Sequence, residues 1–382
     1  MRQIPAAVRQ LSVPGLPRAR GCAFAPALPG GIAASRLLPE LPVARYGHRA
    51  RPRRRAGGAG RVTDVQRARR PHRRAARTRR LRVRYGVNIL NFGTGTEPAT
   101  LLRWARYAEE RGFHFAMISD HVAVTEEVAQ QYEAPFYDPF TTLAWLAGHT
   151  ERIELGTTVT VLPFRHPLLT ARAAANIDRF SGGRLIVGVG VSWSETEYRS
   201  LGVEFGRRGA ITDEYLDVVT RAWRHEKISH HGEFVTFDDV STGPLPVRVP
   251  PVWVGGAGKA ALRRTVRYGD AWHPLNLRMR FIREEGLPTL RRIAEDEGRP
   301  VPQFAPRLPL RLTGSALEEE TRLAGQGTLE QIRRDLDGLA ELGATHVLFD
   351  TYRGEPASMR PQEEDERLLE TVAEHVLSLA KP

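Results

Sequence analysis

The sequence has 382 residues, of which 56 are Lys or Arg and 44 are Asp or Glu, so its formal net charge is +12 at pH 7. Cys22 is the only cysteine, which excludes a disulfide framework and, after that position, any thiolate nucleophile or metal ligand, and favours a reducing, cytoplasmic setting. No apolar run approaches the roughly 20 residues of a membrane span, and the scattered histidines show no metal-ligand spacing.

Residues 1–84 differ sharply in composition from the rest of the chain. They contain 22 Arg, no Lys and only two acids, Glu40 and Asp64, whereas residues 85–382 contain 34 basic and 42 acidic residues. The excess positive charge therefore belongs to this extension, and the acidic body is not expected to bind nucleic acid. A segment rich in Arg, Pro and Ala buries too little apolar surface to offset the entropy of ordering, so we expect residues 1–84 to be disordered.

Several interpretations of this basic extension stay open. An Arg-rich arm could bind nucleic acid, serve as a targeting peptide or contact an anionic membrane. Alternatively, the extension is not a genuine part of the protein, because Arg, Ala, Pro and Gly all have GC-rich codons. In that case the start is mis-assigned, and Val83, just before the first strand-like run, is a plausible true start.

Residues 85–382 alternate short apolar runs with helical patterns, and their number suits a single α/β barrel. Each strand candidate is apolar or β-branched, as in a parallel sheet buried on both faces. The candidates are Tyr85–Leu90, Phe115–Ser119, Ile153–Val161, Leu185–Val189, Val252–Val254, Ala271–His273, Leu308–Leu312 and His346–Phe349. Eight strands alternating with helices predict a (β/α)8 TIM barrel with long insertions, and an open doubly wound sheet is the alternative.

The helical segments carry recognisable start and stop signals. Pro98, Pro139 and Pro167 each suit an early helix position, and a helix opening at Thr328 ends at Gly343. A final helix is expected over Glu364–Leu379, at the end of the chain.

Two long connections interrupt the alternation. They are Val122–Tyr137, after the second strand, and Ser192–Pro251, which includes a possible hairpin around Gly232–Val240. In a barrel, loops that follow strands lie on the active face, so both are candidate lids over a site.

The triplet Ser119-Asp120-His121 ends the second strand and would point into the barrel mouth. Histidine exchanges a proton near neutral pH, and Asp120 could orient the ring or keep it charged. The alternative is that His121 and Asp120 only cap the turn after the strand.

Threonines and glycines mark the next two strands. The hydroxyls of Thr157, Thr158 and Thr160 could face a ligand, or could be satisfied within an ordinary β-branched strand. Gly188 and Gly190 leave room for a flat group or for a close backbone approach, and Trp193 could then cover that group.

A glycine-rich turn over Val254–Lys259 lies between an apolar run and an amphipathic helix. Glycines let the backbone approach a phosphate, and the first free N–H groups of the helix point at it. This order predicts an anion site, although a glycine cluster alone is a weak signal.

Taken in chain order, these motifs closely resemble the bacterial-luciferase-like superfamily. The resemblance covers essentially all of residues 85–382 and none of the extension. It rests on Ser119–His121, on residues 156–163, 181–190 and 251–256, and on the further matching segments 268–273 and 327–346. The most similar branch uses the deazaflavin coenzyme F420, and a close sibling branch uses FMN.

The resemblance implies a role for each matching residue. His121 falls at the active-site histidine, with Asp120 beside it. Thr158 and Val159 fall at a non-prolyl cis peptide that supports the back of the flavin ring. The other implied cofactor-binding residues are Gly190, Ser192 and Trp193 along the ring and tail, and Gly256, Ala257 and Gly258 at the phosphate turn.

One departure bears on the substrate. Trp193 stands where the sugar-phosphate dehydrogenases of this superfamily place an acidic catalytic residue. This difference argues against their substrate and leaves His121 as the main candidate for proton transfer.

The leading hypothesis is therefore an F420-dependent oxidoreductase that passes hydride to or from a small organic substrate while His121 donates or accepts the proton. One alternative is an FMN-dependent monooxygenase that uses reduced flavin and O2, and another is a flavin-binding protein without turnover. Dimers are common in families of this kind, so a homodimer is possible.

Overall fold

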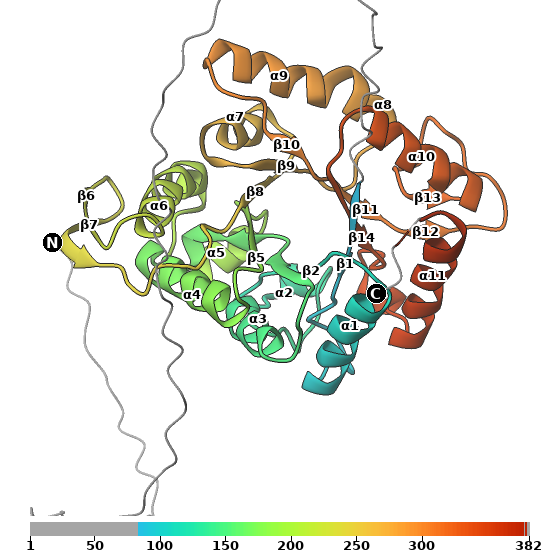
Figure 1. Cartoon of the computed structure of the whole chain (residues 1–382), viewed down its shortest axis with the longest axis horizontal. Coiled ribbons are helices and arrows are strands. Elements are labelled where there is room, and N and C mark those ends of the chain that lie inside the picture. Colours follow the sequence, from blue (N-terminus) through green and yellow to red (C-terminus); the bar gives the residue numbers. More distant parts are fainter. Residues whose placement is uncertain (1–82, 378, 380–382) are drawn as a thin grey trace, which may run out of the picture. The chain divides into compact units, whose positions relative to one another are not determined.

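The computed structural model describes residues 83–377 and residue 379. The predicted extension therefore lies outside the described residues, apart from Val83 and Arg84. No helix in the described part of the chain is long and apolar enough to cross a membrane. Figure 1 shows this part as strands gathered in the centre with helices around them.

The main strands are all parallel and lie side by side in one sheet. They are β1 (Arg84–Asn88), β2 (Phe115–Ile118), β3 (Glu154–Thr157), β4 (Thr160–Val161), β5 (Leu185–Gly190), β8 (Val252–Gly255), β9 (Ala271–His273), β10 (Gln303–Phe304), β11 (Arg307–Pro309) and β14 (His346–Asp350). Within the described residues the order is β10-β9-β8-β5-β3-β2-β1-β14-β11, with β4 beside β5.

This sheet closes on itself. Its two end strands, β10 and β11, are separated in the chain only by Ala305 and Pro306. Backbone hydrogen bonds continue across this junction, from Ala305 N to Trp272 O at 2.9 Å and from Arg307 N to Pro274 O at 2.8 Å. The predicted TIM barrel is therefore confirmed, and the open doubly wound sheet is excluded.

If β3 with β4 and β10 with β11 are each counted as one interrupted strand, the described barrel has eight strands, and a helix follows each of them in the chain. These helices are α1 (Pro98–Glu110), α3 (Pro139–Ala147), α4 (Pro167–Phe180), α6 (Arg208–Ala222), α7 (Lys259–Tyr268), α9 (Leu287–Asp296), α10 (Leu329–Glu341) and α11 (Gln362–His375). As predicted, α1, α3 and α4 each begin with proline, whose missing N–H is an unpaired donor there in any case. Thr328 opens α10 through a capping box with Gln331.

Large side chains fill the centre of the barrel, and glycines make room for them. Phe115 and Trp253 pack edge to face, with ring centroids 5.4 Å apart. A Cβ atom at Gly86 would lie 2.5 Å from the Phe115 ring, so the bulk of Phe115 requires glycine on the neighbouring strand.

Two predicted strands differ from those observed. The seventh was expected over Leu308–Leu312, but it begins at Gln303 and is interrupted at Pro306, which has no N–H to donate. The third was expected to run unbroken over Ile153–Val161, but it divides into β3 and β4 around Thr158.

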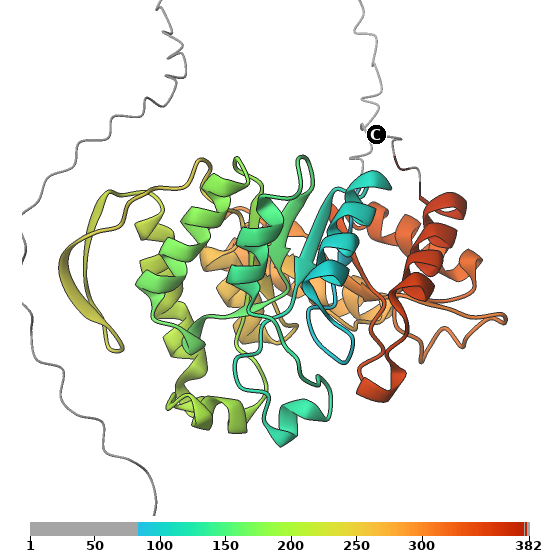
Figure 2. The ribbon, with the colours of Figure 1, turned by 90° about the horizontal axis from the view of Figure 1, so that it is seen from below.

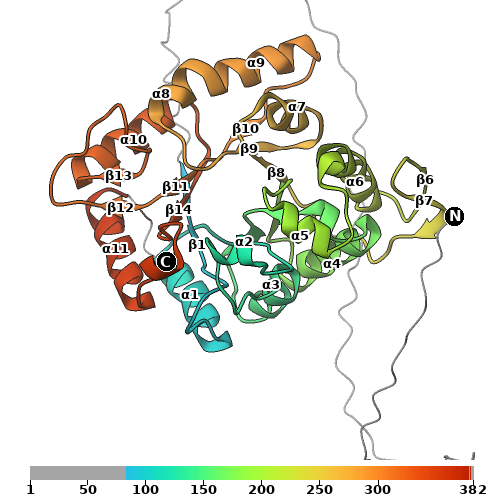
Figure 3. The ribbon, with the colours of Figure 1, turned by 180° about the vertical axis from the view of Figure 1, so that it is seen from behind.

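The two long connections carry short helices. The first contains α2 (Glu126–Ala129), and the second contains α5 (Glu195–Ser200). After α6, the second also contains the antiparallel strands β6 (Lys227–His231) and β7 (Thr236–Ser241), which confirms the hairpin. Figure 2 shows α2 and α5 on one side of the barrel, and Figure 3 shows them in front of its strands. The connections thus lie at the end where β2 and β5 finish, while their action as lids stays a prediction.

Gly188 provides a test of how closely the strands approach. A Cβ atom at Gly188 would lie 2.0 Å from the Thr157 carbonyl oxygen. Replacing Gly188 with Ala should therefore lower the free energy of unfolding in urea by about 1–3 kcal/mol or more, because buried backbone must move. Gly314→Ala is the control, since no atom lies within 4 Å of its Cβ position. Equal urea midpoints for the two variants would contradict this packing.

Candidate active site

His121 lies at the barrel mouth, directly after β2, and a buried carboxylate holds it. Its Nδ1 atom is 2.7 Å from Glu197 Oε2, and Glu197 belongs to α5 in the other long connection. With the carboxylate as acceptor, Nδ1 carries the hydrogen of this contact, and Nε2 has no hydrogen-bond partner among the described residues.

The same carboxylate also fixes the backbone beside His121. Glu197 Oε1 accepts hydrogen bonds from the amides of Val122 at 2.7 Å and Ala123 at 3.0 Å. Glu197 is fully buried and His121 is only 9% exposed. The Glu197 carboxylate thus makes three hydrogen bonds, as a buried carboxylate requires.

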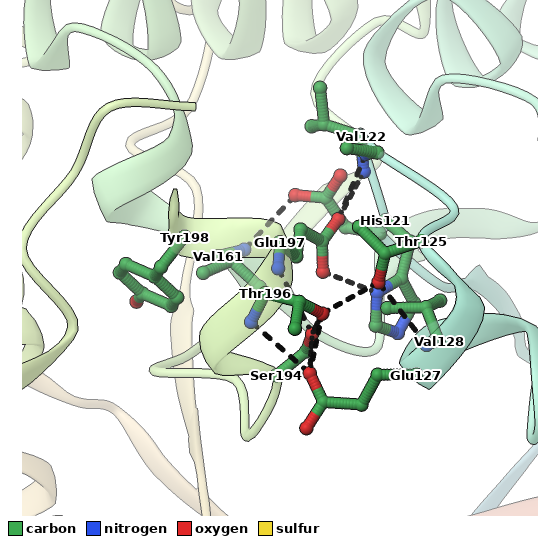
Figure 4. A network of polar contacts seen from close by, with 12 residues as sticks. His121, Val122, Thr125, Glu127, Val128, Val161, Ser194, Thr196, Glu197 and Tyr198 are labelled. Atoms are coloured by element: carbon green, nitrogen blue, oxygen red, sulfur yellow. Dashed lines mark hydrogen bonds and ion pairs between the residues drawn. The ribbon is translucent and has the colours of Figure 1, made fainter. Parts of the chain in front are cut away.

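A second acid also joins the two connections, but this acid lies in the first connection and its hydrogen-bond donors lie in the second. Glu127 in α2 accepts hydrogen bonds from the hydroxyls of Thr196 at 2.6 Å and Ser194 at 2.7 Å. Figure 4 shows these contacts beside the pair formed by His121 and Glu197. Hydrogen bonds from Thr196 and then Ser194 lower the pKa of Glu127. The two predicted lids are therefore bound to each other at the mouth.

Asp120 has a different partner from the one the sequence suggested. Its carboxylate accepts two hydrogen bonds from Arg165, at 2.7 and 2.9 Å, and one from the Val161 amide at 3.0 Å. Asp120 therefore ties the end of β2 to β4 and to the turn before α4, while Glu197 is the acid that contacts His121.

Aromatic rings surround His121. The ring centroid of His121 lies 4.9 Å from that of Tyr132, 5.4 Å from Phe136 and 6.3 Å from Trp193. Trp193 is 40% exposed and so forms part of the open side of this pocket. The His121 ring thus lies among aromatic side chains at the mouth.

The break between β3 and β4 lies behind this pocket. The peptide bond between Thr158 and Val159 is cis, as the resemblance implied. The Val159 side chain occupies the space beside two glycines: a Cβ atom would lie 2.4 Å from it at Gly190 and 3.2 Å from it at Gly255. Gly190 thus makes room for a side chain of the protein itself, whereas the close backbone approach suggested for these glycines is found at Gly188, beside the Thr157 carbonyl.

The Thr158 hydroxyl belongs to a chain of buried polar groups across the mouth. Arg307 Nη1 donates to the Thr158 carbonyl at 2.8 Å, and its other nitrogens bind Asp350 Oδ2 at 2.6 and 3.0 Å. Asp350 Oδ1 accepts a hydrogen bond from Asn88 Nδ2 at 2.9 Å. Thr157 also has its hydroxyl satisfied, by the Gly188 carbonyl at 2.7 Å.

His273 ends this chain as a neutral ring. Burial lowers its pKa to about 4. Its Nδ1 donates to the Ala305 carbonyl at 2.5 Å, so Nε2 accepts from the Thr158 hydroxyl at 2.9 Å. His273 therefore fixes the strand break without carrying charge.

The predicted phosphate turn lies at the end of β8. Gly256 has a positive φ of 97°, and Gly258 is the residue before the first turn of α7. The Gly256 carbonyl accepts a hydrogen bond from Trp272 Nε1 at 2.8 Å, which fixes the turn, and Ala257 lies between the two glycines. The N-cap residue Gly258 offers no side chain to cap α7, and no acidic residue lies in the first turn of this helix. These are features that an anion site at a helix start requires.

The sequence reasoning missed Glu197, Arg307 and Asp350. Ser194 and Glu197 form a Ser-x-x-Glu pattern, which predicts an ordinary helix cap; Ser194 does cap α5, but the glutamate binds His121 instead. Arg307 lay outside the predicted seventh strand. Asp350 ends the eighth strand, and a charged residue at that position was an available signal. In the described residues no group of three His, Cys, Asp or Glu could hold a metal ion.

A closed barrel with a histidine–carboxylate pair at its mouth defines the class as a TIM-barrel enzyme. The chain belongs to the luciferase-like monooxygenase family, whose model matches residues 83–323. Oxidoreductases that use F420 and flavin monooxygenases are both among its relatives and structural neighbours.

The relatives differ in how much of the chain they cover. An uncharacterised protein of Mycobacterium tuberculosis is 33% identical over 205 residues, which are 49% of this chain and 71% of that protein. An F420-dependent glucose-6-phosphate dehydrogenase of Kineococcus radiotolerans is 25% identical over 330 residues, or 75% of this chain and 94% of that enzyme.

Solved structures share the fold at lower identity. An F420-dependent secondary alcohol dehydrogenase in complex with an F420–acetone adduct is 16% identical, has a TM-score of 0.65 and covers 77% of this chain and 99% of its own. The oxygenating constituent of 3,6-diketocamphane monooxygenase from Pseudomonas putida, in complex with FMN, is 14% identical, has a TM-score of 0.61 and covers 79% and 100%.

Glu197→Gln should move the ring hydrogen of His121 from Nδ1 to Nε2 while keeping the contact between the two side chains. The amide would keep its oxygen on the Val122 and Ala123 amides and turn its NH2 group to Nδ1, so that Nε2 carries the hydrogen instead. Nitrogen NMR of histidine-labelled protein, with His121→Gln to assign the signal, measures the tautomer. A neutral ring with hydrogen on Nδ1 in both proteins would contradict the role of Glu197.

His273 should make stability depend on pH. Folding lowers the pKa of His273 from 6.5 to about 4. Between these pH values the unfolded chain binds a proton at this histidine and the folded chain does not, so the free energy of unfolding falls as the pH falls from 6.5 to about 4. The stability advantage over His273→Gln should shrink by about 2 kcal/mol from pH 7 to pH 5, measured by urea unfolding. Burial raises the pKa of Asp365 to about 6, but that opposite effect is common to both proteins. A pH-independent difference would argue against a buried neutral His273.

Proposed function

We propose that this protein is an F420-dependent oxidoreductase that transfers hydride to or from a small organic substrate, with His121 as the proton donor or acceptor. The observation that carries this proposal is the contact of His121 Nδ1 with the buried Glu197, at 2.7 Å, which leaves Nε2 free at the mouth. Likeness to the F420-dependent dehydrogenase over 94% of that enzyme supports the choice of cofactor.

The residues at the mouth suit a flat, polar cofactor with a phosphate. Among the described residues, Asn88 Oδ1 and Ser192 Oγ are buried and have no hydrogen-bond partner, and Ser192 has a positive φ of 54°. Asn88 Oδ1 only accepts, so it suits an N–H group of a deazaflavin ring and not a ring carbonyl. The Ser192 hydroxyl donates and accepts, so it suits either group. The turn formed by Gly256, Ala257 and Gly258 would hold the phosphate.

Each side of the site has its own task in this mechanism. The bound deazaflavin supplies the carbon that gives or takes hydride. Thr158 and Val159, with Gly190 behind them, support the ring, and Trp193 covers its open side. For substrate oxidation, His121 Nε2 accepts the hydroxyl proton, and Glu197 holds the imidazolium that results. For reduction, Nε2 returns that proton to the carbonyl oxygen.

An FMN-dependent monooxygenase is the second candidate. The family takes its description from such enzymes, and the neighbour bound to FMN has the same fold. The same ring support and phosphate turn would serve FMN, and the apolar pocket around His121 would exclude water. Asp120, a cytoplasmic location and a homodimer stay predictions: Asp120 would act through Arg165 and β4 rather than through His121.

Titrating the purified protein with F420 and with FMN tests the proposal. We expect tighter binding of F420, and tighter binding of FMN would favour the monooxygenase. His121→Ala should keep F420 affinity within about threefold but lower the rate of cofactor reduction by about 10²–10⁴-fold, with a substrate found by screening alcohols. His149→Ala, at an exposed position after α3, is the matched control. Unchanged turnover in His121→Ala would remove its catalytic role and leave the flavin-binding function.

A further inference from the structure

Two cavities meet beside the barrel mouth. The inner one, of about 160 Å³, is lined by Tyr132, Arg307 and Asp350, and the outer one, of about 400 Å³, lies along α11. Arg311 and Arg353 line both cavities. We call the two together the arginine groove, and its inner end adjoins the Tyr132 ring that packs on His121 at 4.9 Å.

The charge of this groove is only partly neutralised. Arg307 is bound to Asp350 at 2.6 Å, and Arg360, which lines the outer cavity, is paired with Asp365. Arg311 and Arg353 differ, because neither guanidinium forms a salt bridge or hydrogen bond within the part of the chain that the structure describes.

Arg367 adds a further cation to the outer cavity, where Glu364 is the acidic residue in the lining. Residues 85–382 contain 42 acidic and 34 basic residues, so the net positive charge of this groove is opposite in sign to the net charge of that whole region. A concentration of guanidinium groups in a groove favours carboxylate or phosphate, which they bind with paired hydrogen bonds.

Apolar side chains also line the inner cavity, beside the polar Arg307 and Asp350. Leu275, Leu310 and Leu323 line it together with Tyr132 and Tyr352. The two tyrosine rings stack with centroids 5.7 Å apart, and the Tyr352 hydroxyl donates to the Gln131 carbonyl, which ties this wall to the connection that follows His121. The groove therefore joins an inner end of mixed character, next to the Tyr132 ring that packs on His121, to a cationic outer end along α11.

We propose that the arginine groove selects substrates that are organic acids. The apolar body lies toward Tyr132 and the reacting carbon toward His121, while a carboxylate or phosphate binds Arg311 and Arg353. The assignment of this ligand as a substrate rests on the proposed function. The binding of an organic acid in the groove is independent of that function.

The test uses the full chain without cofactor and a matched pair of probes, 4-phenylbutyrate and 4-phenylbutan-1-ol, followed by calorimetry. The wild type should bind the acid at least about tenfold more tightly than the alcohol, as charged hydrogen bonds provide. Arg311→Gln with Arg353→Gln should abolish this preference. Arg291→Gln with Arg292→Gln on α9, an equal loss of charge at exposed positions, should keep it. No binding of the acid by the wild type, or a preference that survives in the groove variant, overturns the proposal.

A second titration separates the substrate from the cofactor as the source of the acid group. F420 and FMN should bind the groove variant as tightly as the wild type, because their phosphate is assigned to the turn at Gly256–Gly258. A tenfold weaker affinity would give the groove to the cofactor and overturn the substrate assignment. Neither flavin takes part in the first titration, so failure of the proposed cofactor function cannot be mistaken for failure of acid binding.

Discussion

The buried carboxylate of Glu197 is the constraint on which the mouth of this barrel depends. A carboxylate removed from water needs hydrogen-bond donors, and here all three come from the chain just after β2: His121 and the amides of Val122 and Ala123. Meeting that need joins the connection after β5 to the connection after β2. One of the same three bonds orients the His121 imidazole, so the joining of the loops and the placing of this ring are a single interaction.

The opposite side of the mouth solves the problem of buried charge differently. Arg307 is neutralised by Asp350, and it contacts Thr158 at the strand break, where His273 is kept neutral by burial. A second cation at His273 would lie close to Arg307, so the low pKa of this histidine keeps the site from accumulating positive charge. The proposed proton exchange is thus assigned to the His121 side, while the Arg307 side is a fixed, neutralised ion pair.

The sequence predicted the barrel well because its signals are local and repeated. Alternating strands and helices, proline at the first position of α1, α3 and α4, and the hairpin of β6 and β7 each follow from short patterns, and all are found. The site was harder, because its contacts join residues far apart in the chain. Asp120 precedes His121 and was the obvious partner, yet Glu197, 76 positions away, makes the contact. Because Glu197 stands in a Ser-x-x-Glu pattern, the sequence indicates only a helix cap for it and no contact with a distant histidine.

The glycines of β5 show the same limit in another form. From the sequence, Gly188 and Gly190 fit either a flat ligand or a close backbone approach, since both require the absence of a side chain. In the structure the Thr157 carbonyl and the Val159 side chain occupy those spaces. The space beside these two glycines is therefore taken by the protein itself. Glycine in a barrel strand thus identifies where the mouth is shaped, and only the three-dimensional contacts tell which group takes the space.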